Sequence, residues 1–455
     1  MKRLVTLAIM VAFILGGFGV AQAIEFKAKG DWQIGVMGVS NPTFDSDDEV
    51  DEFQATTRVR TTFEFIANEN LRGVMRVHSG DRTWGADGIG REGDDTGVSS
   101  FEYDQAYLDF MIPNSPVNMK VGKQPITFPG TFGSHIFDDT MWGVTATTPI
   151  TDEVGMTLGW SRLDDQVSQG DDRNDEQDFF YAMVPVTLDG VDITPFGMYG
   201  MQGADATIGT TAGMDELEAR ESSEVWWAGV NFAVDMFDPI VISGDFNYGS
   251  QRSFDTDDVD AGSFETDGWI AALSAQYVMD YMTPEIFFMY ESGHDESDMR
   301  DGEGGVMPSI GGDLYGMSTF AGSGSVLRGI GRAAFNNYDG AYGFSAFGAT
   351  GKMAVGAKLG DMSFIDDVTH DLQLTYYQGT NDKDLRGVGD SNEDAFFTTR
   401  DHAWEVTFDT QYQMYENLSA LLELGYLHPS MDSGHADGVE DDSAWKAATG
   451  LRYMF

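Results

Sequence analysis

The chain has 455 residues, 75 acidic against 26 basic side chains and no cysteine, which gives a formal net charge of -49. Such acidity excludes nucleic acid as a partner, because contacts to phosphate groups require a basic surface. Without cysteine there are no disulfides, so stability must come from backbone pairing and burial. The 55 glycines, 12 prolines and 13% aromatic residues indicate a chain rich in strands and turns.

The amino-terminal residues 1–23 have the pattern of a secretory signal peptide. Two basic residues precede a nearly continuous apolar run over 4–20, and Ala-Gln-Ala then supplies a small-x-small cleavage site. The run is short and ends at a cleavage pattern, which favours removal over a membrane anchor. We therefore expect the mature chain to begin near Ile24. No later apolar run has the length that a membrane-spanning helix needs.

Alternation of apolar and polar side chains begins near residue 26. Over 53–67, for example, Phe63 and Phe65 share one parity, while Arg60 and Glu64 share the other. Side chains on a strand point to opposite faces in turn, so each such stretch predicts a strand with one apolar and one polar face. Most of these stretches run about 9–14 residues, which is enough to cross an outer membrane when the strand is tilted.

Long polar connections alternate strictly with short turns along the chain. The long connections are expected near 41–52, 80–99, 125–140, 164–177, 202–222, 251–263, 293–339, 381–398 and 429–442. The short turns are expected near 68–70, 113–115, 150–152, 188–190, 236–238, 280–283, 360–366 and 415–417. This alternation predicts a transmembrane antiparallel up-and-down β-barrel of eighteen strands over 24–455. Sixteen strands is the alternative, in which the Gly-rich connection 293–339 hides or replaces a pairing.

The stretch 443–455 reads as the last strand of this barrel. Trp445, Leu451 and Tyr453 lie on one parity together with Phe455, the carboxy-terminal residue. This ending resembles the terminal strand of bacterial outer-membrane barrels, in which a final Phe is read by the barrel-assembly machinery. The alternative is an ordinary edge strand that happens to end in Phe.

Basic side chains gather on the polar parity of the first and last predicted strands. If lipid lies outside, this parity lines the lumen, and closure of the barrel joins these strands into one continuous wall. The expected basic wall comprises Lys27, Lys29, Arg58, Arg60, Arg72, Arg76, Lys120, Lys446 and Arg452. The alternative is that these bases balance lumen acids such as Asp31 and Glu64, or lie near a rim without a role in transport.

The connection 125–140 is a candidate constriction loop, stiffened by two prolines and bent by two glycines. Its aromatic, histidine and acidic side chains are Phe128, Phe132, His135, Phe137, Asp138 and Asp139. Because it follows a basic strand that ends in Gly-Lys-Gln, it resembles the third loop of trimeric porins, which folds inward. The resemblance implies that Asp138 and Asp139 face four arginines of the basic wall, namely Arg58, Arg60, Arg72 and Arg76. The alternative is a loop that lies outside the barrel with its acids solvated.

The whole pattern is similar to the homotrimeric porins of Gram-negative bacteria. The acidic, Met-rich and Gly-rich composition resembles the porins of sulfate-reducing deltaproteobacteria. The resemblance implies a homotrimer in the outer membrane, in contact with its lipid and with lipopolysaccharide. Eighteen strands depart from the sixteen that are usual in general porins and match sugar-specific porins, which leaves the subfamily open.

Acidic side chains concentrate in the long connections. They include Asp45, Asp47, Asp48, Glu49, Asp51, Glu52, Asp164, Asp165, Asp171, Asp172, Asp255, Asp257, Asp258, Asp260, Asp437, Glu440, Asp441 and Asp442. Oxygen-rich loops suit hard divalent cations, but no loop fits the EF-hand spacing, so only weak binding is expected. No nucleophile-elbow, zinc-ligand or phosphate-loop pattern occurs, and we expect neither a cofactor nor an enzyme.

These features predict a water-filled channel for the passive diffusion of small hydrophilic solutes and ions. One alternative is a substrate-specific channel for a sugar or an oxyanion. Sugar channels use lumen-facing aromatic residues, and the expected lumen parity holds few, Tyr107 and Tyr377 among them. A second alternative is a structural or adhesive surface barrel with a blocked lumen, which would have the same fold and no conductance.

Overall fold

The computed structural model describes the strands and most of the short turns of the chain. The described residues are 24–41, 51–84, 102–165, 176–203, 207–208, 217–218, 223–254, 264–314, 351–385, 397–432 and 442–455. The expected signal peptide and most of the acidic side chains of the long connections lie outside these residues.

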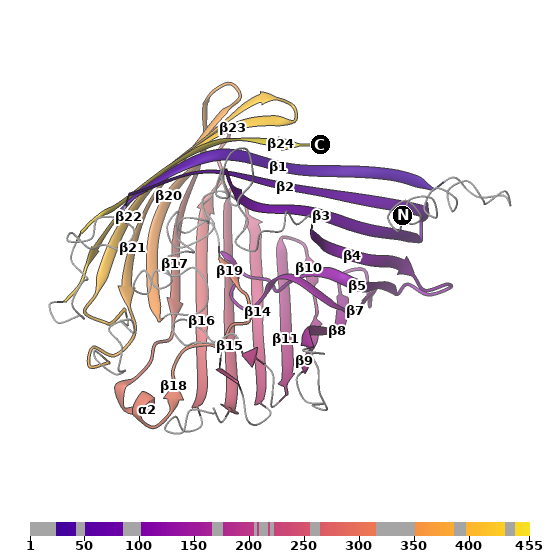
Figure 1. Ribbon diagram of the computed structural model, residues 1–455, viewed down its shortest axis with the longest axis horizontal. Helices are drawn as coiled ribbons and strands as arrows, with labels where there is room; N and C mark the ends of the chain where they lie inside the picture. Colours follow the sequence, from indigo (N-terminus) through magenta and orange to yellow (C-terminus); the bar gives the residue numbers. More distant parts are fainter. Residues whose placement is uncertain are drawn as a thin grey trace, which may run out of the picture.

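Twenty strand segments form one sheet (Figure 1). Nineteen of them make the wall of a barrel, in which neighbouring strands are antiparallel and the last strand pairs with the first; the twentieth, β18, is a short addition described below. The segments of the wall are β1 (Glu25–Ser40), β2 (Asp51–Asn68), β3 (Leu71–Thr83), β4 (Glu102–Met111), β5 (Asn118–Thr127), β7 (Asp138–Pro149), β8 (Gly155–Asp165), β9 (Glu176–Met183), β10 (Val186–Leu188), β11 (Val191–Gln202), β14 (Ser223–Phe237), β15 (Ile240–Phe254), β16 (Phe264–Tyr277), β17 (Thr283–Glu291), β20 (Lys352–Ile365), β21 (Val368–Gly379), β22 (His402–Tyr415), β23 (Leu418–Ser430) and β24 (Ala444–Met454). Because β9 and β10 pair with β11 in one register, they are two parts of one strand. Eighteen strands therefore close the barrel, and the predicted fold and strand number are confirmed.

The remaining elements are short. They are β6 (Gly133–Ser134), β12 (Thr207–Ile208), β13 (Leu217–Glu218), α2 (Glu296–Arg300), β18 (Glu303–Gly304) and β19 (Asp313–Leu314). β18 adds in parallel to β16, and β6 pairs with β19. Among the described residues, no helix has both the length and the apolar character to cross a membrane.

The seam of the barrel lies between β1 and β24. Their pairing runs from Asp31 opposite Met454 to Ser40 opposite Trp445. Gly30 and Phe455 continue it, with backbone N–H to O distances of 2.8 and 3.2 Å. A Cβ atom at Gly30 would overlap the Phe455 ring, so glycine is what lets this ring lie over β1. The residues of β1 before Gly30 pair with β2 alone.

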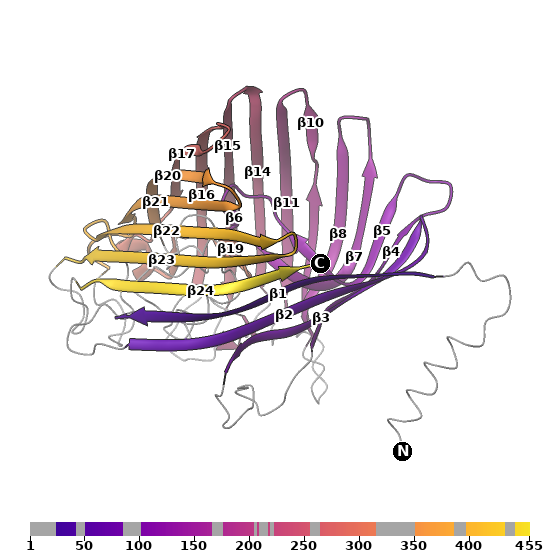
Figure 2. The ribbon, with the colours of Figure 1, turned by 90° about the horizontal axis from the view of Figure 1, so that it is seen from above.

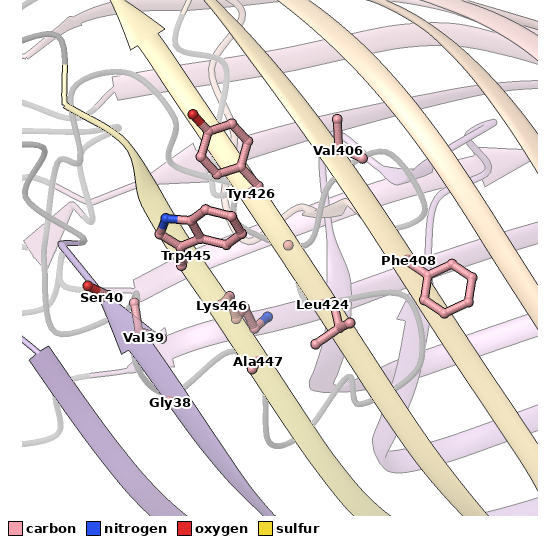
Figure 3. A pocket seen from close by; sticks show the side chains of 11 residues that line it. Gly38, Val39, Ser40, Val406, Phe408, Leu424, Tyr426, Trp445, Lys446 and Ala447 are labelled. Carbon is pink, nitrogen blue, oxygen red and sulfur yellow. The ribbon is translucent and has the colours of Figure 1, made fainter.

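The outer face of the barrel is apolar, as the alternation predicts. On β24, Trp445 is 59% exposed and Lys446, its neighbour on the other face, is 2% exposed. A groove of about 530 Å³ lies on this outer face. Figure 3 shows three of the side chains that line it, Phe408, Leu424 and Trp445, which come from three adjacent strands. Because the groove opens outward, it does not belong to the interior of the barrel.

Two predicted connections have different bounds in the structure. β5 continues through Pro125 to Thr127. A proline is tolerated there because the pairing of β5 with β4 ends at Lys123, so that Pro125 has a neighbouring strand, β7, on one side only. The connection is therefore 128–137 rather than 125–140. β20 continues through the predicted turn near 360, where its register with β21 shifts, and the turn comes at Asp366 and Asp367.

Candidate functional site

The interior of the barrel is the candidate functional site, and its most polar part is the inward face of β1 to β5, here called the open side. Lys29 and Arg72 converge there on Glu64: Lys29 Nζ lies 2.7 Å from Glu64 Oε1, and Arg72 Nη1 lies 3.4 Å from Glu64 Oε2. Arg72 Nη2 also donates to Asp109 Oδ2 at 2.6 Å. Asn118 donates to the other oxygen of Asp109 at 2.7 Å. Bases and acids thus alternate across four strands.

A second group of charges centres on Asp104 of β4. Its Oδ2 lies 2.7 Å from Arg76 Nη2, 3.9 Å from Arg60 Nε and 3.9 Å from His78 Nδ1. Sequence reasoning missed both Asp104 and Asp109. Asp109 lies on the polar parity and could have been found, whereas Asp104 turns inward because the register of β3 and β4 shifts after Arg76.

The other members of the basic wall lie in different surroundings. Arg452 forms a two-point contact with Asp31, at 2.8 and 2.9 Å, across the seam. Lys27 pairs with Glu25 at 3.1 Å, and Lys120 lies 5.9 Å from the centre of the Tyr107 ring. Arg58 is half-buried on β2, opposite Gln33 of β1.

Lys446 does not line an open lumen, contrary to expectation. Its side chain has no exposed surface, and its Nζ lies 2.6 Å from Glu423 Oε1, which is equally buried. The parity was predicted correctly, since Lys446 points inward from β24. Parity shows which face of the strand a side chain lies on, but not whether water or protein surrounds it there. Protein surrounds the Lys446 side chain.

The connection between β5 and β7, here called the inner loop (residues 128–137), lies inside the barrel (Figure 2). Its Phe128 ring is 5.9 Å from Tyr181 of β9 and 5.5 Å from Phe196 of β11. Its Phe132 ring is 5.3 Å from Phe287 of β17. These wall residues all point inward, so the alternative of a loop that lies outside the barrel is wrong.

Phe137 and His135 complete the buried part of the inner loop. Phe137 is 2% exposed. His135 Nε2 lies 3.6 Å from Asp245 Oδ2 of β15, and both side chains are buried. Burial lowers the pKa of His135, although the nearby Asp245 carboxylate opposes that shift. The histidine therefore faces Asp245 as a neutral group at neutral pH.

Asp138 and Asp139 belong to the barrel wall rather than to the inner loop. They open β7, where Asp138 Oδ1 accepts a hydrogen bond from Thr127 Oγ1 at 2.6 Å. Asp139 is exposed and accepts from the backbone of Thr140. The carboxylates that contact Arg72 and Arg76 come instead from β2 and β4. The expected constriction residues thus divide into an apolar inner loop and two wall acids.

Many more aromatic side chains face the interior than the sequence predicted. They are Phe179, Tyr181, Phe196, Trp227 and Phe287, in addition to Tyr107 and Tyr377. The five added residues are buried beneath the inner loop or beside it, so they form a core rather than a track along an open channel. We call the inward faces of β9, β11, β14 to β17 and β20 the packed side. Apolar residues on both parities of 176–183 and 223–230 were the available signal.

Within the described ranges, no group of three or more His, Asp or Glu side chains has a geometry that could hold a metal ion. The acidic connections that suggested weak cation binding lie largely outside those ranges.

The closed barrel of eighteen antiparallel strands is a fold that solved structures share. No protein-family model and no curated protein matches the sequence. OpdQ of Pseudomonas aeruginosa is similar with a TM-score of 0.52 and 12% identity, over 94% of this chain and 98% of that chain. OprD of the same bacterium is similar with a TM-score of 0.51 and 14% identity, over 96% and 97%. OccK8 (OprE) of this bacterium has a TM-score of 0.51 and 11% identity, over 95% and 98%. At these identities the likeness shows the fold alone.

Proposed function

We propose that the chain is an outer-membrane porin that forms a water-filled channel for the passive diffusion of small hydrophilic solutes and ions. One observation carries the proposal: charged side chains inside a closed, apolar-coated barrel remain exposed. Lys29 is 64% and Arg72 is 41% exposed on the inward face of the open side. A charge in contact with lipid is strongly unfavourable, so an apolar exterior around a wetted, charged interior is the arrangement of a pore.

The channel discriminates by width and by the charges of its wall. The inner loop fills the packed side, which leaves the open side as the path for solutes. Along that path, guanidinium and carboxylate groups alternate and present polar contacts to solutes of either sign. An oxyanion-specific channel would need arginines that no acid neutralises. Here Asp109 pairs with Arg72, and Asp104 pairs with Arg76. A general diffusion pore fits these contacts better.

The chain acts as a channel and not as an enzyme. In the outer membrane its apolar belt contacts lipid and lipopolysaccharide, and the strand that ends at Phe455 is the segment for the barrel-assembly machinery to recognise. We further propose a homotrimer of the type found in sulfate-reducing deltaproteobacteria. The support for these finer points is the resemblance in sequence, with Phe455 held in the seam by two backbone hydrogen bonds.

The test is conductance of the refolded protein in a planar bilayer, with the reversal potential measured in a salt gradient. Ohmic steps, grouped in threes for a trimer, are the expected result. The sign of the reversal potential shows which charges dominate the path. Silence from protein that migrates as a folded, heat-modifiable barrel would overturn the porin and leave a structural or adhesive barrel.

A further inference from the structure

A second stretch of chain lies inside the barrel beside the inner loop. Residues 303–314, here called the inner segment, follow α2 and belong to the Gly-rich connection between β17 and β20. Thr266 Oγ1 of β16 donates to the carbonyl of Val306 at 2.7 Å. Trp227 Nε1 of β14 donates to the carbonyl of Pro308 at 2.7 Å. Met307 is completely buried between them. The inner segment is thus fixed to the packed side by two buried hydrogen bonds.

The inner segment is also bonded to the inner loop. The Ile310 N–H donates to the carbonyl of Ile136 at 3.2 Å, and the Asp138 N–H donates to the carbonyl of Gly311 at 2.9 Å. Beyond these bonds, Ser134 and Asp313 are partners in the short antiparallel pairing of β6 with β19. One connection therefore holds the other in place through backbone groups. A Cβ atom at Gly312 would lie 2.7 Å from the carbonyl oxygen of Ser134, so this close approach requires glycine.

Asp245 of β15 attaches the inner loop directly to the wall. Its side chain has no exposed surface. Its Oδ1 accepts the backbone N–H of Thr131 at 2.6 Å, and its Oδ2 accepts from Asn247 at 2.7 Å and faces His135 Nε2 at 3.6 Å. A buried carboxylate is stable only with donors around it, and the inner loop provides one of them across 114 positions of sequence. Moving the inner loop away would remove that donor.

We propose that Asp245 is a positioning residue for the inner loop and that the inner segment is its clasp, so that together they set the width of the pore. This inference rests on the proposed channel function. Two attachments act beside the aromatic contacts of the inner loop to hold it against the packed side: a carboxylate from the wall and a backbone pairing from the inner segment. Loss of either attachment raises the population in which the inner loop lies in the path along the open side.

The experiment compares Asp245→Ala and Asp245→Asn with wild type by single-channel recording in a planar bilayer. Removal of a charged hydrogen-bond acceptor is expected to raise the population of the undocked inner loop roughly 10- to 100-fold, seen as added open-channel noise and sublevels. Asp245→Asn keeps an acceptor for the Thr131 N–H, and its open-channel noise is expected to lie between that of wild type and that of Asp245→Ala. Asp267→Ala is the matched control, because that carboxylate accepts from Tyr248 on the outer face of the neighbouring strand.

A second variant keeps the test decisive if Asp245→Ala fails to fold. The chain has no cysteine, so Ser134→Cys combined with Asp313→Cys introduces a single disulfide across β6 and β19, where antiparallel partners have suitable spacing. Oxidation is expected to leave wild-type conductance unchanged and to suppress the noise of Asp245→Asn; reduction restores that noise. Quiet recordings from both Asp245 variants, with or without the disulfide, overturn the proposal. A silent wild type overturns the porin function itself.

Discussion

Lys29 and Lys352 form the same kind of contact on opposite sides of the barrel. Lys29 pairs with Glu64 at 2.7 Å on the open side and is 64% exposed, whereas Lys352 pairs with Glu291 at 3.1 Å on the packed side and is 2% exposed. Both lysines point inward from a strand of the wall. The difference comes from the inner loop and the inner segment, which fill one side of the interior and leave the other to water. The same inward parity therefore gives an exposed, charged surface in one place and a protein core in another.

The largest effect is expected for Trp227, because its side chain belongs to the core of the packed side. Trp227→Ala removes a ring that is 1% exposed and its hydrogen bond to Pro308, and should lower the free energy of unfolding by about 3–5 kcal/mol. The neighbouring Trp226 is 39% exposed on the outer face. Trp226→Ala is the control and should have a smaller effect. Urea titration in lipid vesicles measures both. Equal losses would show that the packed side is not a core.

The two lysine pairs should differ nearly as much. Lys352→Ala leaves Glu291 buried without this partner and is expected to cost about 3–5 kcal/mol of unfolding free energy. Lys29→Ala removes a solvent-screened pair, and Glu64 keeps Arg72, so a change of about 0–1 kcal/mol is expected. The same urea titration measures this contrast. Similar values for the two variants would mean that burial does not separate the two sides.

Acid should weaken the packed side through His294, which follows β17. Its Nδ1 accepts the Gly305 N–H at 3.0 Å near the start of the inner segment, and burial lowers the pKa of His294 to about 4. The unfolded chain binds this proton near pH 6.5, so the contribution is complete above that pH and is lost as the pH falls toward 4. The expected loss in unfolding free energy is up to about 3 kcal/mol.

The control for this pH effect is His294→Gln, which cannot take up the proton. Its unfolding free energy should vary less than that of wild type between pH 7 and pH 4, measured by the same urea titration. Identical profiles for the two proteins would assign the acid sensitivity to other groups.

The smallest effect on stability, and the clearest on transport, is expected for Arg72. Neutralisation of this partly exposed charge by Arg72→Gln should shift the cation-to-anion permeability ratio toward cations by up to about fivefold at low salt, because a unit charge at close range in water acts with about 1 kcal/mol. The shift should fade at high salt. Arg162→Gln is the control, since Arg162 pairs with Asp178 beside Trp160 on the outer face. Reversal potentials that respond alike would remove Arg72 from the path.

The sequence predicted the fold because alternation and loop length both report on a single closed sheet. The strand number, the inward parity of Arg72 and Arg452 and the outward parity of Trp445 all follow from that pattern. Alternation did not predict which inward-facing side chains are exposed and which are buried. Lys446 and Trp227 have the parity of lumen residues, but only the three-dimensional structure shows that they are buried, Trp227 against the inner segment and Lys446 beside Glu423. Asp245 attracted no notice because its partner, Thr131, is 114 positions away.

The seam has a consequence for how the barrel folds. Asp31 and Arg452, which bond across it, are 421 positions apart in the sequence. The entropy of closing so long a loop grows only with the logarithm of its length, but contacts this distant form late and slow the reaction. Until they form, β1 and β24 each present an unpaired edge, and such edges invite pairing with other chains. The newly made chain therefore needs protection from aggregation until its first and last strands meet.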